Sequence, residues 1–224
     1  MKEIIAVETL TLVEISEMFR KSVHTVLSKA MTTIETKSKK LDKEQITKHK
    51  WVKTYEVFKG ANLNFYCQKT AKNIMPTISI GMTHRTTEGM ILVILDVANG
   101  GSNNGFFRKD RWEQWVKIYK GHACERFAER IVNSKTPTFA KGVEELMFSD
   151  IPAVARVIDN IAENVDKIEL LFKDGCWFGY RDSANKIVYI RTTYSNDMLK
   201  SDRAKFRDDW ELTLVEVHEL FKKE

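Results

Sequence analysis

The spacing of apolar residues along the chain predicts where helices and strands lie. In residues 8–35 apolar side chains recur every three or four positions, which predicts an amphipathic helical region broken near Arg20–Ser22. Residues 42–59 show the same spacing and end at Gly60, so we predict a further helix there. We therefore expect the N-terminal region, residues 1–60, to be helical.

A different pattern begins at Pro76. Residues 76–101 contain two β-branched runs separated by Thr-Glu-Gly, which predicts a hairpin. The second run, MILVILDV, is apolar at nearly every position, so we expect that strand to be buried on both faces.

Helical spacing returns in residues 109–132 and 139–161, and strands follow in KIELLFKDG, CWFGYRDSANK and IVYIRTTYS. An amphipathic pattern over residues 201–221 predicts a closing helix. The order predicts the α+β class: N-terminal helices, a strand pair, central helices and a C-terminal antiparallel strand meander with a closing helix. We divide the chain into the N-terminal region and an α+β body over residues 61–224.

The segment Glu14–Ala30, EISEMFRKSVHTVLSKA, resembles a helix-turn-helix of DNA-binding proteins. Arg20 and Lys21 depart from that motif, because they stand where a turn glycine and a buried apolar residue are expected. An ordinary amphipathic helix pair fits the same pattern, so the segment leaves both interpretations open.

Composition narrows the class of protein. With 224 residues, of which 43% are hydrophobic, the chain has enough apolar surface for a core, which excludes wholesale disorder. Its 3 cysteines lie far apart and form no C-x-x-C pair, which points to a reducing compartment. No apolar run has the length of a membrane span. We expect a soluble, cytoplasmic protein without a membrane contact, and we find no metal-ligand or cofactor motif.

The charge is unevenly distributed. There are 36 Lys and Arg residues against 31 Asp and Glu residues, a net charge of +5. Basic residues concentrate between Lys37 and Lys53, which is the pattern of a phosphate-binding segment or of a solvated helix or linker. The candidate nucleic-acid contacts in this run are Lys37, Lys39, Lys40, Lys43, Lys48 and Lys50.

The segment GHACERFAERIV, residues 121–132, carries a second basic feature. On a helix of about 3.6 residues per turn, His122, Arg126 and Arg130 fall on one stripe. Apolar residues fill the opposite face: Ala123, Cys124, Phe127, Ala128 and Ile131. Like charges at this spacing cost about 0.2–0.5 kcal/mol per pair, so the stripe suits an anionic ligand better than it suits helix stability.

This helix, a second helix and a strand meander ending in Thr193, Tyr194 and Ser195 resemble the superfamily of metal-independent ribonucleases and toxins. That superfamily includes the barnase, EndoU, colicin E5/D and RelE folds and phage-borne branches. The resemblance covers residues 109–200 and rests on short motifs.

The resemblance implies cleavage of RNA through the substrate's own 2′-hydroxyl, without a metal or cofactor. It implies that His122 is the general acid or base and that Arg126, Arg130 and Arg191 hold phosphate. It also implies that Thr193 or Tyr194 donates to a phosphate oxygen. Two alternatives stay open: a nucleic-acid-binding protein without catalysis, and a phage-type structural protein that assembles with itself or with a protein partner.

Overall fold

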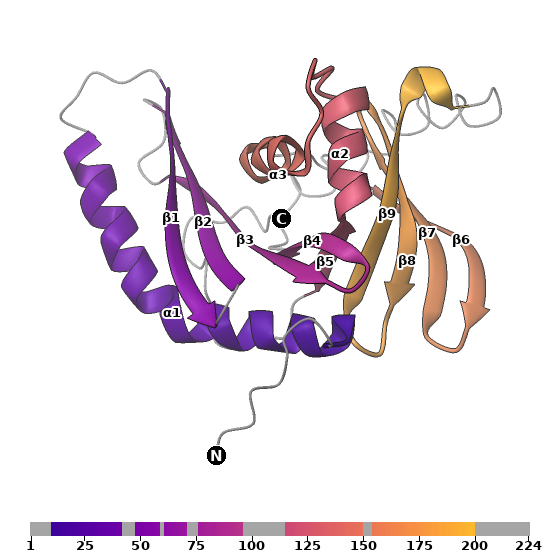
Figure 1. Cartoon of the computed structure of the whole chain (residues 1–224), viewed down its shortest axis with the longest axis horizontal. Helices are drawn as coiled ribbons and strands as arrows, with labels where there is room; N and C mark the ends of the chain where they lie inside the picture. The colour runs from indigo at the N-terminus through magenta and orange to yellow at the C-terminus, as the bar shows by residue number, and fades with distance from the viewer. Residues whose placement is uncertain are drawn as a thin grey trace, which may run out of the picture.

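The computed structural model describes residues 10–41, 48–58, 61–70, 76–95, 115–149 and 154–199. It has α+β architecture, as predicted, built on one large mixed sheet (Figure 1). The N-terminal half contains α1 (Leu12–Leu41), β1 (Lys48–Phe58), β2 (Ala61–Thr70), β3 (Thr77–Thr86) and β4 (Gly89–Leu95). Next come β5 (Val116–Lys120), α2 (Gly121–Arg130) and α3 (Phe139–Phe148). The meander is β6 (Val154–Ala162), β7 (Val165–Phe172), β8 (Gly175–Asp182) and β9 (Ile187–Ser195), followed by the 3-10 turn Asn196–Met198.

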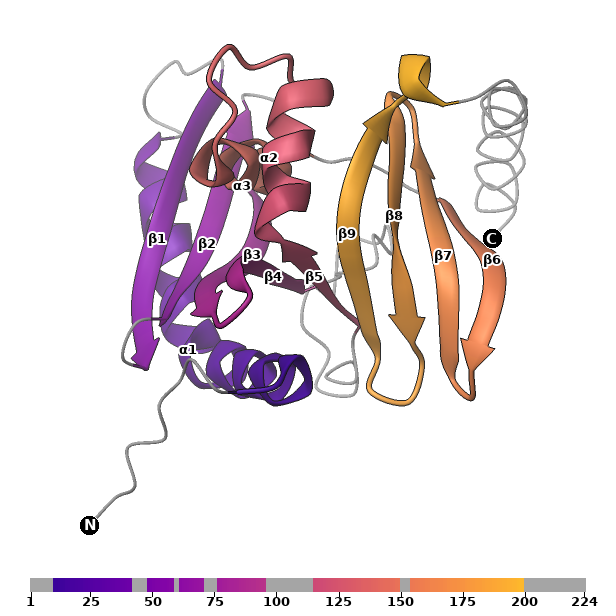
Figure 2. The same ribbon diagram turned by 45° about the vertical axis from the view of Figure 1, so that its right-hand side comes forward.

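The strand order in the sheet is β1-β2-β3-β4-β5-β9-β8-β7-β6. Two antiparallel meanders, β1–β5 and β6–β9, meet where β5 pairs with β9 in parallel (Figure 2). Because β1 pairs with β2 across residue 60, the N-terminal region and the start of the α+β body share one sheet.

Two hydrophobic cores lie against this sheet. Core 1 lies between α1 and β1–β5 and includes Phe19, Phe65 and Val93. Core 2 lies between α2, α3 and the β6–β9 meander and includes Phe127, Met147 and Trp177. β4 contributes Ile91 and Val93 to core 1 and Leu92 to core 2, which confirms the prediction that its apolar run is buried on both faces.

The predicted break in the first helix is wrong. α1 runs uninterrupted from Leu12 to Leu41, so the described structure has no helix-turn-helix at residues 14–30. Arg20, at the expected turn, instead donates hydrogen bonds to the carbonyl oxygens of Asn185 and Lys186, both at 3.0 Å. Without a glycine or proline there, the chain has no local reason to leave the helix.

Three predicted helices are partly strands. Residues 48–58 form β1, in which Trp51, Tyr55 and Val57 alternate toward core 1, and pairing with β2 prevails over the weaker helical spacing. Residues 116–120 form β5, so within the described part of the predicted 109–132 helix, residues 115–132, the helix is confined to residues 121–130. The predicted 139–161 helix ends at Phe148, before Pro152, and β6 follows.

The predicted hairpin and the last strands of the meander are confirmed as β3–β4 and β7–β9. The predicted closing helix over residues 201–221 lies outside the described residues. Within the described ranges, no helix is long and apolar enough to span a bilayer.

Candidate functional site

The basic stripe predicted for residues 121–132 lies on α2. The helix follows β5 directly, and its buried residues are Ala123, Cys124, Phe127 and Ala128, which confirms the predicted core face. Thr193 attaches this helix to β9: its hydroxyl donates to the carbonyl oxygen of Ala123 at 3.3 Å. His122, Arg126 and Arg130 lie on the side of α2 away from these buried residues, next to β9.

The members of the stripe contact one another. The Nε atom of Arg126 donates to Nε2 of His122 at 3.3 Å, and its Nη1 atom donates to Glu129. The Nε atom of Arg130 lies 3.9 Å from the same Glu129 carboxylate. The hydrogen bond from Arg126 is the largest cause of the lowered pKa of Glu129, and the nearby charges of Arg126, Arg130 and His122 lower it further. Glu129 therefore offsets part of the positive charge that the sequence predicts for the stripe.

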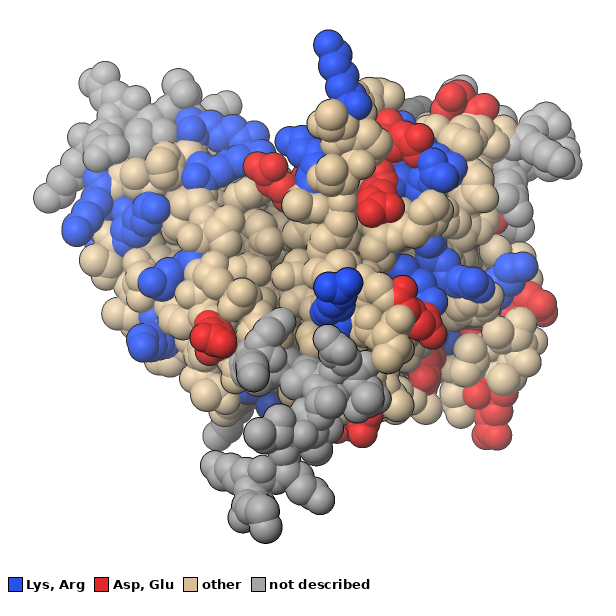
Figure 3. All heavy atoms as spheres, viewed as in Figure 1, with Lys and Arg blue, Asp and Glu red and all other residues tan. Residues whose placement is uncertain are grey.

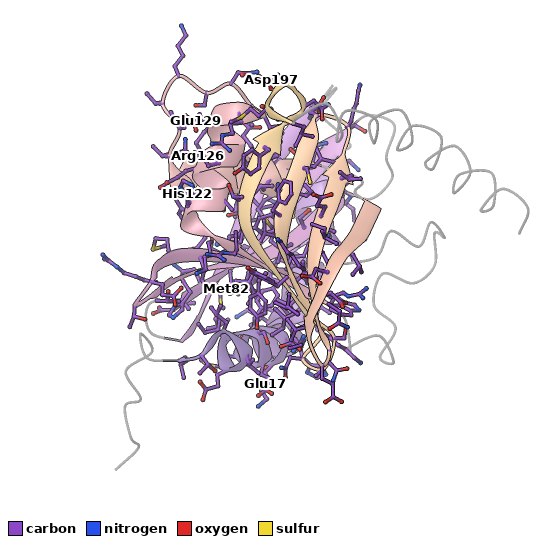
Figure 4. All side chains as sticks on the ribbon, turned by 90° about the vertical axis from the view of Figure 1, so that its right-hand side faces the viewer. Glu17, Met82, His122, Arg126, Glu129 and Asp197 are labelled. Atoms are coloured by element: carbon purple, nitrogen blue, oxygen red, sulfur yellow. The ribbon has the colours of Figure 1, made fainter. Side chains whose placement is uncertain are left out.

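A pocket of about 400 Å³ opens beside the N-terminal end of this stripe. It lies on the face of β7, β8 and β9 that points away from core 2, and Figure 4 shows His122 and Arg126 on α2 beside β9. The lining residues are His122, Lys167, Ile168, Phe178, Gly179, Tyr180, Arg191, Thr192 and Tyr194.

The alternation of side chains along the strands explains this lining. Trp177 faces core 2, so its neighbour Phe178 faces the other way, toward the pocket. The same rule sends Ile168 to the core and Lys167 to the pocket side. The pocket thus draws its rings and charges from positions that the core does not use.

A bulge between β8 and β9 places Arg191 at the pocket. Phe178 pairs with Thr192 but Gly179 pairs with Ile190, so Arg191 has no one-to-one partner in the register. A Cβ at position 179 would overlap the carbonyl oxygen of Tyr189, so only glycine allows the strands this approach. Bulges of this kind redirect a side chain, here that of Arg191.

Two arginine–tyrosine pairs border the pocket. Arg191 donates to the hydroxyl of Tyr180 at 3.1 Å, and its guanidinium lies 5.7 Å from that ring centre. The guanidinium of Arg130 lies 4.9 Å from the ring centre of Tyr194, which also makes an edge contact with Phe178 at 5.3 Å. These contacts hold planar cations and rings in fixed positions at the surface.

The predicted catalytic residues are thus divided among three places. His122 and Tyr194 line the pocket together with Arg191. Arg126 and Arg130 line a second hollow of about 540 Å³ with Glu129 and Asp197. Thr193 lines neither hollow; it is fully buried, and its carbonyl oxygen accepts a hydrogen bond from Arg130 at 2.6 Å. Thr193 therefore does not donate to a ligand in this pocket, and its role is to position α2.

The predicted lysine contacts form a separate surface. Lys37, Lys39 and Lys40 lie in the last turns of α1, while Lys48 and Lys50 lie on β1. Lys43 is outside the described residues. Figure 3 shows basic side chains along this margin of the molecule, and the strand order places β1 and the pocket strands far apart in the sheet.

Sequence reasoning missed six pocket residues: Lys167, Ile168, Phe178, Gly179, Tyr180 and Thr192. The alternation in CWFGYRD already places Phe178 and Tyr180 on the face opposite Trp177. For Lys167 and Thr192 we find no signal in the sequence, because their relation to His122 arises only when β7 and β9 lie beside α2.

The fold and this site define an α+β protein with a cationic, aromatic-lined pocket on the face of the β6–β9 meander opposite core 2. Comparison of the chain with family models, curated proteins and solved structures yields no significant match in any of the three. The ribonuclease resemblance therefore stays a prediction.

Proposed function

We propose that the protein binds single-stranded nucleic acid and that the pocket holds one nucleotide. The observation that carries the proposal is the composition of one pocket lining: His122, Lys167 and Arg191 supply positive or protonatable groups, and three aromatic rings lie among them. Among the described residues, none of those that line the pocket carries a carboxylate. An anion attached to a flat ring is the ligand chemistry that such a surface favours.

Phosphate is the anion that fits best. Arg191 offers a planar guanidinium and Lys167 a mobile ammonium group, and both groups contact phosphate oxygens in nucleic-acid complexes. These contacts carry little sequence information, so we expect affinity to depend on salt more than on base sequence.

The rings favour an unpaired base. Bases stack on aromatic side chains and on guanidinium planes only when they are free of a duplex. The pocket volume of about 400 Å³ is at the small end of ligand sites, which suits one nucleotide rather than several.

Fluorescence anisotropy with labelled single strands and the matching duplex tests the proposal. Arg191→Gln and Tyr180→Ala are each expected to weaken single-strand binding about 5- to 100-fold, the range seen for lost stacking or charge contacts. Lys173→Gln is the matched control, because Lys173 is exposed at the β7–β8 turn and does not line the pocket. Equal binding by all four proteins, or no binding by wild type, would reject the proposed site.

RNA cleavage without a metal is a second candidate function, favoured by His122 in the same pocket as Lys167 and Arg191. In that reaction a base removes the 2′-hydroxyl proton and the 2′-oxygen bonds to phosphorus. The bond to the 5′-oxygen then breaks, and that oxygen takes a proton from an acid. Cationic groups stabilise the charge that develops on the phosphate.

The contact with Arg126 constrains the part that His122 would take. A guanidinium only donates, so the Nε2 atom that accepts from Arg126 carries no proton and the ring proton is on Nδ1. In this arrangement the ring is neutral, and a general-acid role requires a second proton on Nε2, which Arg126 excludes while it donates there. A base role for Nε2 requires Arg126 to move away, for example onto a bound phosphate.

Incubation of RNA with the protein in excess chelator tests cleavage. We expect a 2′,3′-cyclic phosphate product, no cleavage when the scissile nucleotide is 2′-deoxy, and no cleavage by His122→Gln. Binding that persists without cleavage in wild type would reject catalysis and leave the binding function in place.

A further inference from the structure

Lysines at the C-terminal end of α1 and on β1 form a second basic surface, and several of them contact aromatic rings instead of extending into solvent. We call it the α1–β1 basic surface; its members are Lys37, Lys39, Lys40, Lys48, Lys50 and Lys53. The first three lie at the C-terminal end of α1 and the others on β1, which is the edge strand of the described sheet. Packing of α1 against β1 brings Lys53 to the same face as the α1 lysines, while Lys48 and Lys50 point to the other face of β1, toward α3, so the surface wraps around this sheet edge.

Aromatic rings hold three of these ammonium groups in place. Lys37 lies 5.1 Å from the ring centre of Trp51, and Lys53 lies 5.4 Å from that of Tyr55. Lys50 lies 4.7 Å from the ring centre of Phe148, which belongs to α3. A lysine held over a ring has fewer rotamers to lose when it binds an anion, so these groups are partly preorganised.

Acidic side chains are sparse here. Within the described part of this surface, β1 contributes Glu56 as its one carboxylate, and Glu35 lies on α1 before the lysines begin. In the view of Figure 3 the blue side chains extend along the α1 and β1 margin, whereas red and blue are mixed around α2 and the meander. The surface therefore attracts a polyanion rather than one acidic residue.

The surface is remote from the pocket. β8, which carries Phe178 and Tyr180, stands six positions from β1 in the strand order, a path of roughly 29 Å along the sheet at about 4.8 Å per strand. Figure 1 shows β1 and β6–β9 at opposite sides of the molecule. One nucleotide in the pocket does not reach these lysines.

We propose that the α1–β1 basic surface is a second contact for the sugar-phosphate backbone, so that one long strand is held at two remote places. The inference rests on the proposed function of the pocket, which binds the first part of the strand. Once one part is bound, the rest of the strand is at high effective concentration near the second surface. A longer strand also offers more positions at which the pocket can bind. Affinity should rise with strand length by more than this larger number of positions predicts.

The experiment compares the binding of a 5-nucleotide and a 40-nucleotide oligothymidylate strand at several salt concentrations. The test variant replaces Lys37, Lys50 and Lys53 with Gln. Its matched control replaces Lys21, Lys29 and Lys135, which are exposed elsewhere on α1 and in the α2–α3 loop. Circular dichroism and melting of both variants check that the fold is retained.

For wild type and control, we expect the long strand to bind at least about 10-fold more tightly than the short one, after correction for the number of registers. The test variant should lose this gain and keep its affinity for the short strand. Its salt slope for the long strand should be about 2 units shallower, at about 0.7 unit per phosphate contact.

The outcomes separate the two proposals. If the short strand binds but the test variant behaves like the control, the second contact is overturned and the pocket stands. If neither strand binds, the proposed function fails, and the second contact fails with it. In that case polyglutamate and anionic vesicles are tried on the same variants, and binding that depends on Lys37, Lys50 and Lys53 reassigns the surface to an acidic protein or a membrane.

Discussion

Arg126 donates to two acceptors at once, the Nε2 atom of His122 and the carboxylate of Glu129. A bound phosphate would have to compete with Glu129 for Arg126 and for Arg130 beside it. At the scale of single residues, Glu129 is thus the group that opposes anion binding along the stripe.

Replacing Glu129 with Gln should therefore raise nucleic-acid affinity. Exposed ion pairs contribute little because water and salt screen them, so we expect an increase of no more than about 5-fold at low salt. As the pH falls, the nucleic-acid affinity of wild type should approach that of the variant. Because the pKa of Glu129 is lowered, this change is expected only at a pH below the usual range for a glutamate. Anisotropy titrations at two pH values measure both effects, with Glu125→Gln as the control; an unchanged affinity would mean that Arg126 and Arg130 contact no phosphate.

Phe127 and His122 lie on opposite sides of α2 and should respond differently to truncation. Phe127 is 1% exposed, and its ring centre lies 6.1 Å from that of Trp177 in core 2. Phe127→Ala should lower the free energy of unfolding by about 3–5 kcal/mol. His122→Ala, at an exposed position, should change it by less than about 0.5 kcal/mol while weakening nucleic-acid binding. Urea unfolding measures both; a large loss for His122→Ala would make the stripe structural.

The cysteines should be unreactive in the folded protein. All 3 are free and buried. Burial raises the pKa of Cys67 from 9.0 to about 12 and raises that of Cys124. Because the folded-state pKa lies above that of the exposed thiol, burial disfavours the thiolate, and the stability contributed is lost only as the pH rises above about 9. Ellman's reagent at pH 8 should label the thiols fully in denaturant and slowly without it; fast labelling of the native protein would contradict this burial.

At the scale of elements, the contact between α2 and α3 depends on a glycine. A Cβ at Gly142 would overlap the carbonyl oxygen of Cys124 on α2, and backbone cannot move aside as a side chain can. This approach brings Val143 and Met147 of α3 into core 2 beside Phe127.

Gly142→Ala should therefore destabilise the protein by about 3 kcal/mol or more, although alanine favours helices over glycine. Glu144→Ala, exposed on the same helix, should change stability by less than about 0.5 kcal/mol. Thermal melts of the two variants provide the comparison. A Gly142→Ala protein as stable as wild type would show that the helices have room to separate.

At the scale of the whole molecule, the two cores share their central strands. Ile118 of β5 belongs to core 1 and Tyr119 to core 2, and β9 is divided in the same way by Ile187 and Ile190. Loss of either core exposes one face of these strands, so we expect the two halves to unfold together.

Arg20 connects the halves directly. Its Nη2 atom donates to the carbonyl oxygens of Asn185 and Lys186, and the Lys186 carbonyl also accepts from the amide of Val116 at 3.0 Å. Burial lowers the pKa of Arg20, though not enough to remove its charge near neutral pH. Arg20→Ala should cost about 2–3 kcal/mol and lower the Tm by about 5–10 °C in a single transition.

Calorimetry tests this prediction, with Arg85→Ala, exposed at the end of β3, as the control. Two separate transitions in wild type would mean that the halves are independent. A Tm equal to that of the control would mean that the contact of Arg20 contributes nothing to stability.

The sequence alone determined the features in which one local pattern has no strong competitor. α2 has a full apolar face at helical spacing, the β3–β4 hairpin has β-branched runs around a turn, and the last strands alternate cleanly. Their side-chain period alone specifies what each segment buries. The placement of His122, Arg126 and Arg130 on one stripe of α2 follows from the same period.

Only the tertiary structure decided two kinds of feature. One is the type of element in segments whose sequence fits both a helix and a strand, and the other is which residues distant in sequence come together. In β1, Trp51 and Tyr55 fit a helix or a strand, and pairing with β2 selects the strand. The pocket likewise depends on β7 and β9 lying beside α2, and no local pattern encodes the meeting of Lys167 or Arg191 with His122. Local periodicity specifies a side chain's face, whereas long-range strand pairing and core burial specify its neighbours.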